Sequence, residues 1–316
     1  MTPGNRERLV HTMTEESLVQ IKIPKKGEKA RRPSWMRVKV AETPEYREVA
    51  RLVKDLKLNT VCQEARCPNI WECWGEHRTA TFMIMGDICT RACRYCDVTS
   101  GKPGPLDASE PGNVAEAVCQ MGLRHAVITS VDRDDLPDFG ALHWVETILA
   151  IKRGSPECAV EVLTPDFGGS VPELLRVLDA RPEVFSHNIE TVRRLHPKMR
   201  SKGDYVRTLE VLRRAHQYRS EGQVAMNTKT GLMLGLGETL EEVLEVFDDL
   251  RGVHCDVLTM GQYLNPTHRH APIHRFYPPS EFEWLKEEAI KRGFKHVESG
   301  PLVRSSYHAH EHGTNQ

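Results

Sequence analysis

The sequence predicts an α/β fold, a partial (β/α)6 barrel, on two observations. Six short apolar runs alternate with amphipathic segments between residues 81 and 295, and this alternation favours parallel strands joined by right-handed crossovers. Polar residues follow several of the runs, as in SVDRDD after the second run and GLGET after the fifth. Because the chemistry of such barrels lies on loops at the carboxyl ends of the strands, we expect the functional site at that end.

The individual elements are read from their periodicity, in chain order. Apolar runs bounded by turn residues predict strands at 81–87, 125–131, 158–165, 184–190, 226–238 and 256–264. Apolar residues at helical spacing predict helices at 113–122, 141–153, 171–180, 207–218, 240–251 and 280–293. Each predicted strand is therefore followed by one predicted helix.

Three segments lie outside this repeat. Residues 1–55 form a polar arm, whose basic stretch at 22–40 contains two prolines and has no sustained helical period. We interpret the arm as a solvated segment that wraps around the domain with Trp35 as its anchor, and a dedicated docking site is the alternative. Residues 56–80 form a cysteine-bearing segment, residues 81–295 the core, and residues 296–316 a tail.

The composition argues against several classes of protein. The 316 residues include 43 lysines and arginines and 44 aspartates and glutamates, so the formal net charge is −1 and no nucleic-acid partner is expected. No apolar run approaches the roughly 18 residues of a membrane span, and the first residues lack the apolar segment of a signal peptide. We therefore expect a cytoplasmic protein without a membrane partner. In a reducing cytosol, clustered cysteines are more often metal ligands than disulfides.

Six of the nine cysteines lie between residues 62 and 96, in two triplets. The second triplet, Cys89, Cys93 and Cys96, has the spacing C-x3-C-x2-C. A structural zinc site needs four ligands, commonly in paired C-x2-C form, and no fourth ligand is adjacent here. Three thiolates can instead bind three irons of a 4Fe–4S cube and leave the fourth iron open. The spacing therefore predicts an iron–sulfur cluster that can bind a chelating substrate or cofactor.

The motif CTRACRYC, placed after the first strand of a β/α repeat, resembles that of the radical S-adenosylmethionine superfamily. This resemblance implies a barrel of the radical S-adenosylmethionine type, with an N-terminal extension that carries an auxiliary cluster. In that superfamily the open iron binds S-adenosylmethionine, and one electron cleaves the cofactor to give a 5′-deoxyadenosyl radical. The resemblance places Tyr95 near the adenine, and it suggests cofactor contacts for Thr129, Ser130, Asp132, Asn188 and Glu190. The alternative role of these polar residues is to cap a helix or to bond backbone groups.

The first triplet, Cys62, Cys67 and Cys73, has the spacing C-x4-C-x5-C, which is not that of a zinc ribbon. Together with GLMLGLGET, GQYLNPTHRH and GPLVRSSYHA, it resembles the lipoyl synthase family over about residues 35–309. The family pattern places the fourth ligand of this auxiliary 4Fe–4S cluster at the second serine of RSSY, Ser306, which would release its iron during catalysis. The alternative is that Ser306 only caps the tail.

The resemblance implies an enzyme that inserts two sulfur atoms at the sixth and eighth carbons of a protein-bound octanoyl-lysine chain. It implies two molecules of S-adenosylmethionine per product and the auxiliary cluster as the sulfur source. The implied partners are octanoylated lipoyl domains of 2-oxoacid dehydrogenases, the glycine-cleavage H protein, and an electron donor such as ferredoxin or flavodoxin. Two alternatives stay open, namely another radical S-adenosylmethionine sulfurtransferase and a binding module stabilised by two structural zinc ions.

The remaining thiols and the histidine-rich stretches give weaker signals. Cys119, Cys158 and Cys255 lie in apolar segments and are expected to be inert core thiols. The histidines of THRHAPIH (267–274) and HAHEH (308–312) are expected at a solvated surface, with metal binding as the alternative.

Overall fold

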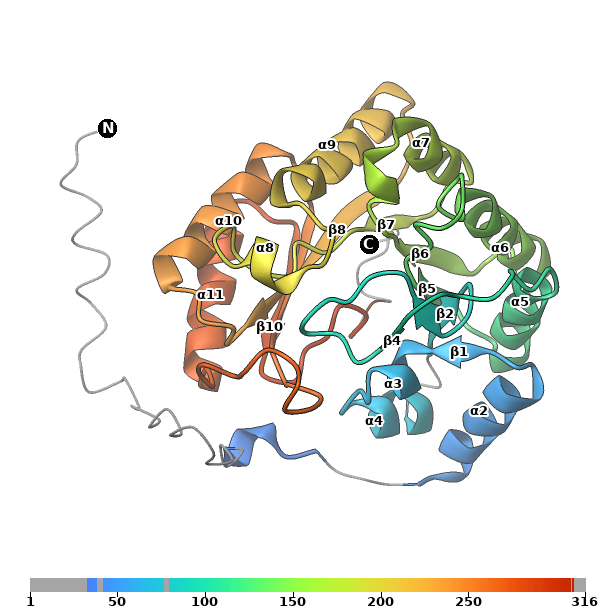
Figure 1. Ribbon diagram of the computed structural model, residues 1–316, viewed down its shortest axis with the longest axis horizontal. Helices are drawn as coiled ribbons and strands as arrows, with labels where there is room; N and C mark the ends of the chain where they lie inside the picture. Colours follow the sequence, from blue (N-terminus) through green and yellow to red (C-terminus); the bar gives the residue numbers. More distant parts are fainter. Residues whose placement is uncertain (1–32, 39–41, 77–79, 308, 310–316) are drawn as a thin grey trace.

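The computed structural model describes residues 33–38, 42–76, 80–307 and 309, so most of the predicted basic stretch and most of HAHEH lie outside the described residues. It contains an eight-stranded sheet of order β1-β2-β5-β6-β7-β8-β9-β10, curved around a central lumen (Figure 1). Strands β2 to β10 pair in parallel, whereas β1 pairs with β2 in the antiparallel sense. Because β1 and β10 are not paired with each other in the described part of the chain, the barrel is partial, as predicted.

The strands agree with the predicted runs, and there are two additional ones in the main sheet. The main sheet contains β1 Asn59–Thr60, β2 Thr81–Ile84, β5 His125–Ser130, β6 Ala159–Leu163, β7 Val184–Ser186, β8 Asn227–Leu234, β9 Val257–Gln262 and β10 His296–Gly300. A separate parallel pair is formed by β3 Ile88–Cys89 and β4 Thr99–Ser100. Most predicted runs extend beyond the observed strands because their last residues turn into the loops of the site.

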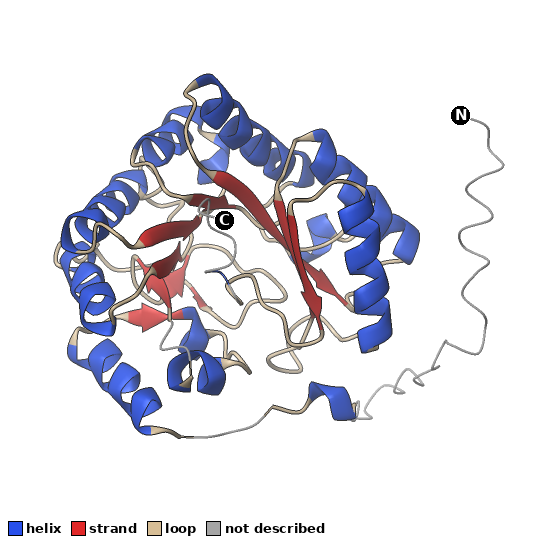
Figure 2. Cartoon of the chain, turned by 180° about the vertical axis from the view of Figure 1, so that it is seen from behind, coloured by secondary structure: helices blue, strands red, loops and turns tan. Residues whose placement is uncertain are grey.

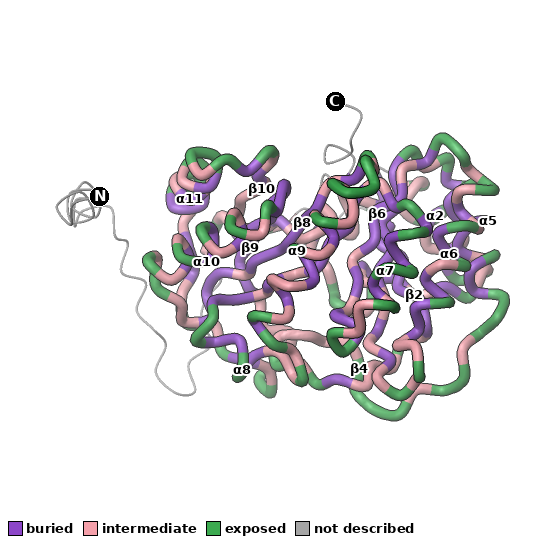
Figure 3. The backbone as a smooth tube through the Cα atoms, turned by 90° about the horizontal axis from the view of Figure 1, so that it is seen from above, coloured by how far each residue is buried: buried purple, intermediate pink, exposed green. Residues whose placement is uncertain are grey.

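Six helices cover the outside of the sheet, one after each of the predicted strands (Figures 1 and 2). They are α5 Glu110–Met121, α6 Ala141–Gly154, α7 Val171–Asp179, α9 Tyr205–Glu221, α10 Leu240–Gly252 and α11 Pro279–Lys291. Helix α6 illustrates the packing, since Trp144, Ile148 and Ile151 share one face and are fully buried. Figure 3 shows that the buried backbone follows the strands and the inner faces of these helices.

Shorter elements complete the chain. They are η3 Ser34–Met36, α2 Pro44–Asp55, α3 Val61–Glu64, α4 Ile70–Gly75, η4 Phe167–Gly169 and α8 His196–Met199. Helix α2 lies inside the segment that was predicted as a polar arm, where Thr43 caps it and Pro44 occupies its first position. Helix α2 lies in the predicted arm and strand β10 lies in the predicted tail, so both segments contain regular structure. The division into arm, cysteine segment, core and tail itself stays a prediction.

A buried ion pair lies inside the barrel, below the carboxyl ends of the strands. Lys229 Nζ on β8 lies 2.7 Å from Glu161 Oε1 on β6, and His125 Nε2 lies 3.2 Å from the other carboxylate oxygen. Gly231 and Leu163, two residues further along these strands, line the cavity described below. The ion pair therefore forms the layer under the cavity floor.

Among the described residues, no helix combines the length and the apolar character needed to cross a lipid bilayer.

Candidate active site

One cavity of about 650 Å³ brings the two cysteine triplets together at the carboxyl ends of the strands. All three cysteines of the second triplet line it, and so does Cys67 of the first triplet. Arg304 and Ser305 of the RSSY motif line it from the tail. All six residues predicted to contact S-adenosylmethionine belong to its wall, namely Tyr95, Thr129, Ser130, Asp132, Asn188 and Glu190.

The second triplet occupies the loop after β2, and backbone donors surround its first thiol. Cys89 Sγ accepts hydrogen bonds from the backbone N–H groups of Arg91 at 3.4 Å and Asp132 at 3.3 Å. Burial raises the pKa of Cys89 to about 11, and burial together with the neighbouring thiols raises that of Cys96 to about 12. Three thiols that face one cavity, with N–H donors at one of them, fit a site that releases protons when it binds a cationic cluster.

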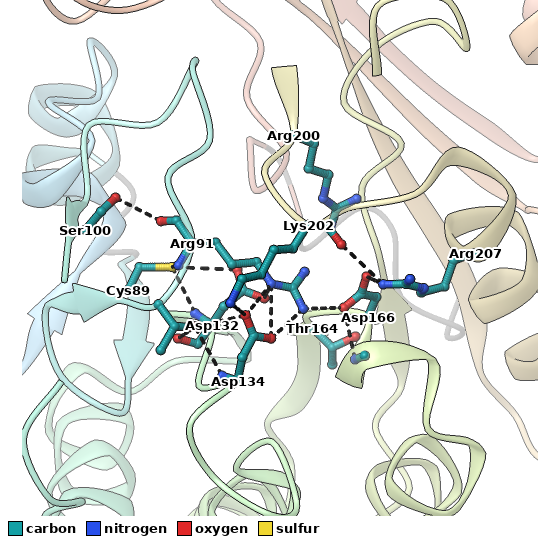
Figure 4. Close-up of polar contacts among 12 residues, drawn as sticks. Cys89, Arg91, Ser100, Asp132, Asp134, Thr164, Asp166, Arg200, Lys202 and Arg207 are labelled. Atoms are coloured by element: carbon teal, nitrogen blue, oxygen red, sulfur yellow. Dashed lines mark hydrogen bonds and ion pairs between the residues drawn. The ribbon is translucent and has the colours of Figure 1, made fainter. Parts of the chain in front are cut away.

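Arg91, inside the CTRACRYC motif, anchors this loop to the following strands (Figure 4). Its side chain is 3% exposed, and Nη2 lies 2.7 Å from both Asp134 Oδ1 and Asp166 Oδ1. The guanidinium group holds the pKa of both carboxyl groups below their usual range, although burial opposes this effect. Arg207 contacts the second oxygen of Asp166 at 3.0 Å. Arg91 was not among the predicted site residues. The signal for it in the sequence was a basic residue inside CTRACRYC and the acidic stretch SVDRDD, which could supply its partners.

Several of the predicted cofactor contacts present polar atoms without a hydrogen-bond partner in the described structure. These buried atoms are Ser130 Oγ, Asp132 Oδ1 and Asn188 Oδ1. Asp132 Oδ1 has an ion-pair contact with Arg91 Nε at 3.3 Å, but no hydrogen bond. Buried polar atoms are nearly always satisfied in proteins, so three such atoms on one cavity wall fit a polar ligand. Thr129 is different, because its hydroxyl already donates to the Leu163 carbonyl at 2.9 Å.

Tyr95 and Glu190 form a half-buried polar group together with Arg200. Burial raises the pKa of Glu190, and Arg200 acts in the opposite direction. The Arg200 guanidinium donates to the Asn188 carbonyl at 2.7 Å, so it also fixes the backbone of a segment that is predicted to contact the cofactor. Glu190 has a φ of 65°, in the left-handed region that non-glycine residues rarely adopt and that often marks functional sites. Arg200 was missed because it lies in a segment to which the sequence analysis assigned no element.

The first triplet lies on a short segment formed by α3, α4 and the turn between them. Cys62 lies in α3 and Cys73 in α4, whereas Cys67 follows a left-handed residue, Arg66, with a φ of 47°. Burial raises the pKa of Cys62 to about 11, and the charge of Cys67 adds to this effect.

Three hydrogen bonds join this segment and β2 to the tail. Asn69 Nδ2 donates to the Leu302 carbonyl at 2.7 Å, and the Tyr307 hydroxyl contacts Glu72 Oε1 at 2.9 Å. Thr81 Oγ1 donates to Ser306 Oγ at 2.8 Å. The backbone of Thr81 also acts on the Cys62 thiol and lowers its pKa, against the larger raising effect of burial, so Thr81 is a neighbour of both Ser306 and the first triplet. This arrangement fits Ser306 as a partner of the three cysteines.

The donor arrangement does not resemble a single-metal site. In the described parts of the chain, no three histidine, cysteine, aspartate or glutamate side chains converge on one point that could hold a metal ion. A structural zinc ion needs four ligands around one centre, whereas the ligands of a 4Fe–4S cube bind different irons. The geometry therefore favours clusters over the zinc-stabilised alternative.

One minor expectation was wrong and another holds in part. Cys119 is exposed rather than a core thiol, although Cys158 and Cys255 are buried as expected. His268 and His274 are exposed as expected, whereas His270 is half-buried. Its Nε2 atom lies 2.9 Å from the Cys96 carbonyl, and Thr267 bonds its other ring nitrogen. His270 thus supports the loop of the second triplet from the loop that follows β9.

Comparisons with known proteins agree with this site. The family model of the radical SAM superfamily matches residues 83–250. The fold is similar to that of Streptococcus suis SuiB bound to S-adenosylmethionine, with a TM-score of 0.53 and 13% identity, over 81% of this chain and 61% of that one. The fold and the cysteine site together define a radical S-adenosylmethionine enzyme.

Sequence relatives identify the particular family. The model of the N-terminal domain of lipoyl synthase matches residues 7–67. The lipoyl synthase of Symbiobacterium thermophilum is 55% identical over 282 residues, which are 89% of this chain and 87% of the relative. That of Rubrobacter xylanophilus is 54% identical over 92% of this chain and 89% of the relative. The chain belongs to the lipoyl synthase family.

Proposed function

We propose that this enzyme inserts two sulfur atoms into a protein-bound octanoyl-lysine chain, at its sixth and eighth carbons, to form the lipoyl group. The observation that carries this proposal is that one cavity is lined by Cys67 of the first triplet and by all three cysteines of the second. Unactivated methylene groups have no acidic proton, so acid–base catalysis cannot remove their hydrogens and a radical is required. A radical source and a sulfur source must then lie within reach of the same carbon atom, and one shared cavity satisfies that condition.

Two 4Fe–4S clusters and S-adenosylmethionine are the cofactors of this family. We assign Cys89, Cys93 and Cys96 to one cluster, and Cys62, Cys67, Cys73 and Ser306 to the auxiliary cluster. When bound, these cofactors supply the hydrogen-abstracting radical and the two sulfur atoms. The unpartnered atoms of Ser130, Asp132 and Asn188 support a role in orienting S-adenosylmethionine, together with Tyr95, Thr129 and Glu190.

Ser306 would have a distinct role among the ligands. Iron–sulfur clusters prefer soft thiolates, and a serine oxygen is a hard donor. A ligand of this kind suits a cluster that must give up iron when its sulfur is used. The hydrogen bond from Thr81 supports this role, because the Ser306 oxygen accepts it from a residue whose backbone also acts on the Cys62 thiol.

The substrate would be an octanoyl-lysine on a lipoyl domain of a 2-oxoacid dehydrogenase or on the glycine-cleavage H protein. Apolar side chains in the cavity wall, including Met83, Leu232 and Val303, suit a chain of methylene groups. A ferredoxin or flavodoxin would supply the electrons. None of the nine cysteines forms a disulfide, which is consistent with work in a reducing cytoplasm.

The proposal is tested by anaerobic incubation of the reconstituted enzyme with an octanoyl-lysine peptide, S-adenosylmethionine and a reductant. Mass spectrometry should detect a product that carries two added sulfur atoms, together with 5′-deoxyadenosine. A hexanoyl-lysine peptide, which has no eighth carbon, is the matched control and should not yield a dithiolated product. Cleavage of S-adenosylmethionine without any sulfur in the octanoyl peptide would contradict the proposal.

A further inference from the structure

The arginines that line the cavity do not share the same electrostatic surroundings. Four arginines contribute to the described cavity wall, and three of them have an acidic neighbour. These three pairs are Arg66 with Asp97 at 3.0 Å, Arg91 with Asp166 at 2.7 Å, and Arg200 with Glu190, to which it is electrostatically coupled. The fourth arginine, Arg304, has no such partner in the part of the chain that the structure describes.

Arg304 is an unpaired cation at the inner end of the tail. Within the described ranges, no carboxylate forms an ion pair with it, and its guanidinium group donates only to the adjacent Val303 carbonyl, at 2.6 Å. Cys67, the cysteine of the first triplet that reaches the cavity, lines the same cavity as Arg304, and the charge of this thiol acts on the guanidinium group. Arg304 is half-buried in the cavity wall, so its guanidinium group has lost part of its hydration without gaining an ion pair among the described residues. Its position therefore indicates that an anion belongs beside it.

The close approach of the tail to β9 holds Arg304 in this place. A Cβ atom at Gly261 would lie 2.0 Å from the Val303 carbonyl oxygen and 3.2 Å from Arg304 Nη1. Only glycine at this position lets the backbone of the tail lie against the strand. The guanidinium group is thereby fixed at the cavity wall, on the side where Cys67 lies.

We propose that Arg304 supplies the counter-charge of the auxiliary cluster and is thus a positioning residue for the sulfur-donating centre. This inference rests on the ligand set of the proposed function. Three thiolates and one serine oxygen make that centre anionic, and Arg304 lies two residues from Ser306 and lines the same cavity as Cys67. Arg91 and Arg200 lie in the part of the cavity wall that holds the second triplet. Each triplet then has an arginine of its own in the cavity wall.

The test uses the full chain with Cys89, Cys93 and Cys96 replaced by alanine, so that only the auxiliary cluster is bound. The reduction potential of this cluster is measured by mediated spectroscopic titration, with Arg304 intact and with Arg304→Gln or Arg304→Lys. Loss of a positive charge beside the cluster disfavours the more negative, reduced state, so Arg304→Gln should lower the potential. Arg304→Lys keeps the charge and should restore most of the shift. Arg304→Met replaces the glutamine variant if circular dichroism shows that the latter does not fold.

Arg66→Gln is the matched control. It removes the same charge next to Cys67 in sequence, but its side chain is 72% exposed and paired with Asp97, so water screens it and the potential should not move. An unchanged potential in both Arg304→Gln and Arg304→Met would overturn the inference. KM for the octanoyl peptide is measured separately, with Arg304→Gln in a chain that keeps both cysteine triplets. A raised KM there, together with an unchanged potential, would also overturn the inference and would assign Arg304 to the substrate. If no cluster binds even when Arg304 is intact, the proposed ligand set fails instead.

Discussion

The hydroxyl group of Thr81 donates a 2.8 Å hydrogen bond to the hydroxyl group of Ser306, across 225 residues of sequence. Thr81 is the first residue of β2, and its backbone lowers the pKa of the Cys62 thiol, against the raising effect of burial. A single residue at the start of β2 is therefore a neighbour of both the first cysteine triplet and the tail.

Thr81→Val tests this connection. The substitution keeps the shape of the side chain and removes the hydroxyl donor, so Ser306 should lose its orientation. We expect a lower yield of dithiolated peptide with normal formation of 5′-deoxyadenosine, and a loss of about 1 kcal/mol in the free energy of unfolding, typical of one hydrogen bond. In a Ser306→Ala background the same substitution should have no further effect on product. An undiminished effect there would show that Thr81 does not act through Ser306.

Replacing one cysteine of each triplet should separate cofactor cleavage from sulfur supply. Cys93→Ala should abolish 5′-deoxyadenosine, whereas Cys67→Ala should spare its formation and abolish the thiolated product. Each variant should lose about half of its iron, because each 4Fe–4S cluster has its own ligands. Cys119→Ala is the control, since this exposed thiol lies in neither triplet and should leave iron content and both products unchanged. Normal 5′-deoxyadenosine from Cys93→Ala would contradict the assignment.

If Ser306 is a labile ligand, a stronger ligand at this position should preserve cluster binding and slow turnover. Ser306→Cys should retain the full iron content, since thiolate is the preferred donor, and yet form little dithiolated product. Both quantities are measured on the same preparation, by iron analysis and mass spectrometry. Ser305→Ala is the matched control from the same motif and should keep most of the activity. Full activity of Ser306→Cys would mean that release of the fourth ligand does not limit the reaction.

Arg91→Met should strongly destabilise the protein without cofactors. The substitution leaves Asp134 and Asp166 without their buried partner, and breaking such a pair typically costs about 3–5 kcal/mol. Arg207 retains one contact to Asp166, so the lower end of this range is expected. Urea unfolding followed by circular dichroism gives the free energy. Arg213→Met removes an exposed arginine paired with Glu210 and should change it by no more than about 1 kcal/mol.

His187 should make the stability of the cofactor-free protein pH dependent. Burial and the charge of Arg200 lower the pKa of His187 from 6.5 to about 3. The unfolded chain then binds a proton that the folded chain rejects, so this stabilisation is complete above pH 6.5 and is lost as the pH falls towards 3. The loss approaches about 1.4 kcal/mol per pH unit.

Urea unfolding between pH 7 and about pH 4.5 measures this slope. His187→Gln should flatten it by up to one proton, whereas His268→Gln, at an exposed residue, should not. An identical slope in wild type and His187→Gln would contradict the assignment of this titration.

The barrel could be predicted because its signal is local. Each of the six runs contains at least two adjacent apolar residues and is followed by a helix with one buried face, as in α6 with Trp144 and Ile148. Strand β10 was missed because its sequence, HVESG, has one buried residue, Val297, among half-buried polar ones. Its position depends on pairing with β9, which no local pattern reveals.

The candidate site was predictable only in part, for a similar reason. The cysteines, Ser306 and the polar residues at strand ends follow motifs that can be read along the chain. The roles of the arginines could not be assigned from the sequence, because each role depends on which carboxylates the fold brings next to the guanidinium group. Arg91 meets Asp166 from 75 positions away, whereas Arg304 meets no carboxylate among the described residues.

The long sequence separation between Thr81 and Ser306 also bears on the order in which the two cluster sites are completed during synthesis. Ribosomes make the chain from its N-terminus, so Thr81 precedes Ser306 by 225 residues, or roughly 10–45 s at about 5–20 residues per second. The second triplet and its partners Arg91 and Arg200 are all made within this interval. The proposed auxiliary site still lacks both Arg304 and Ser306 until β10 has been synthesised. The pocket for the radical-generating cluster can therefore form on the nascent chain, and the pocket for the sulfur-donating cluster is the last to be completed.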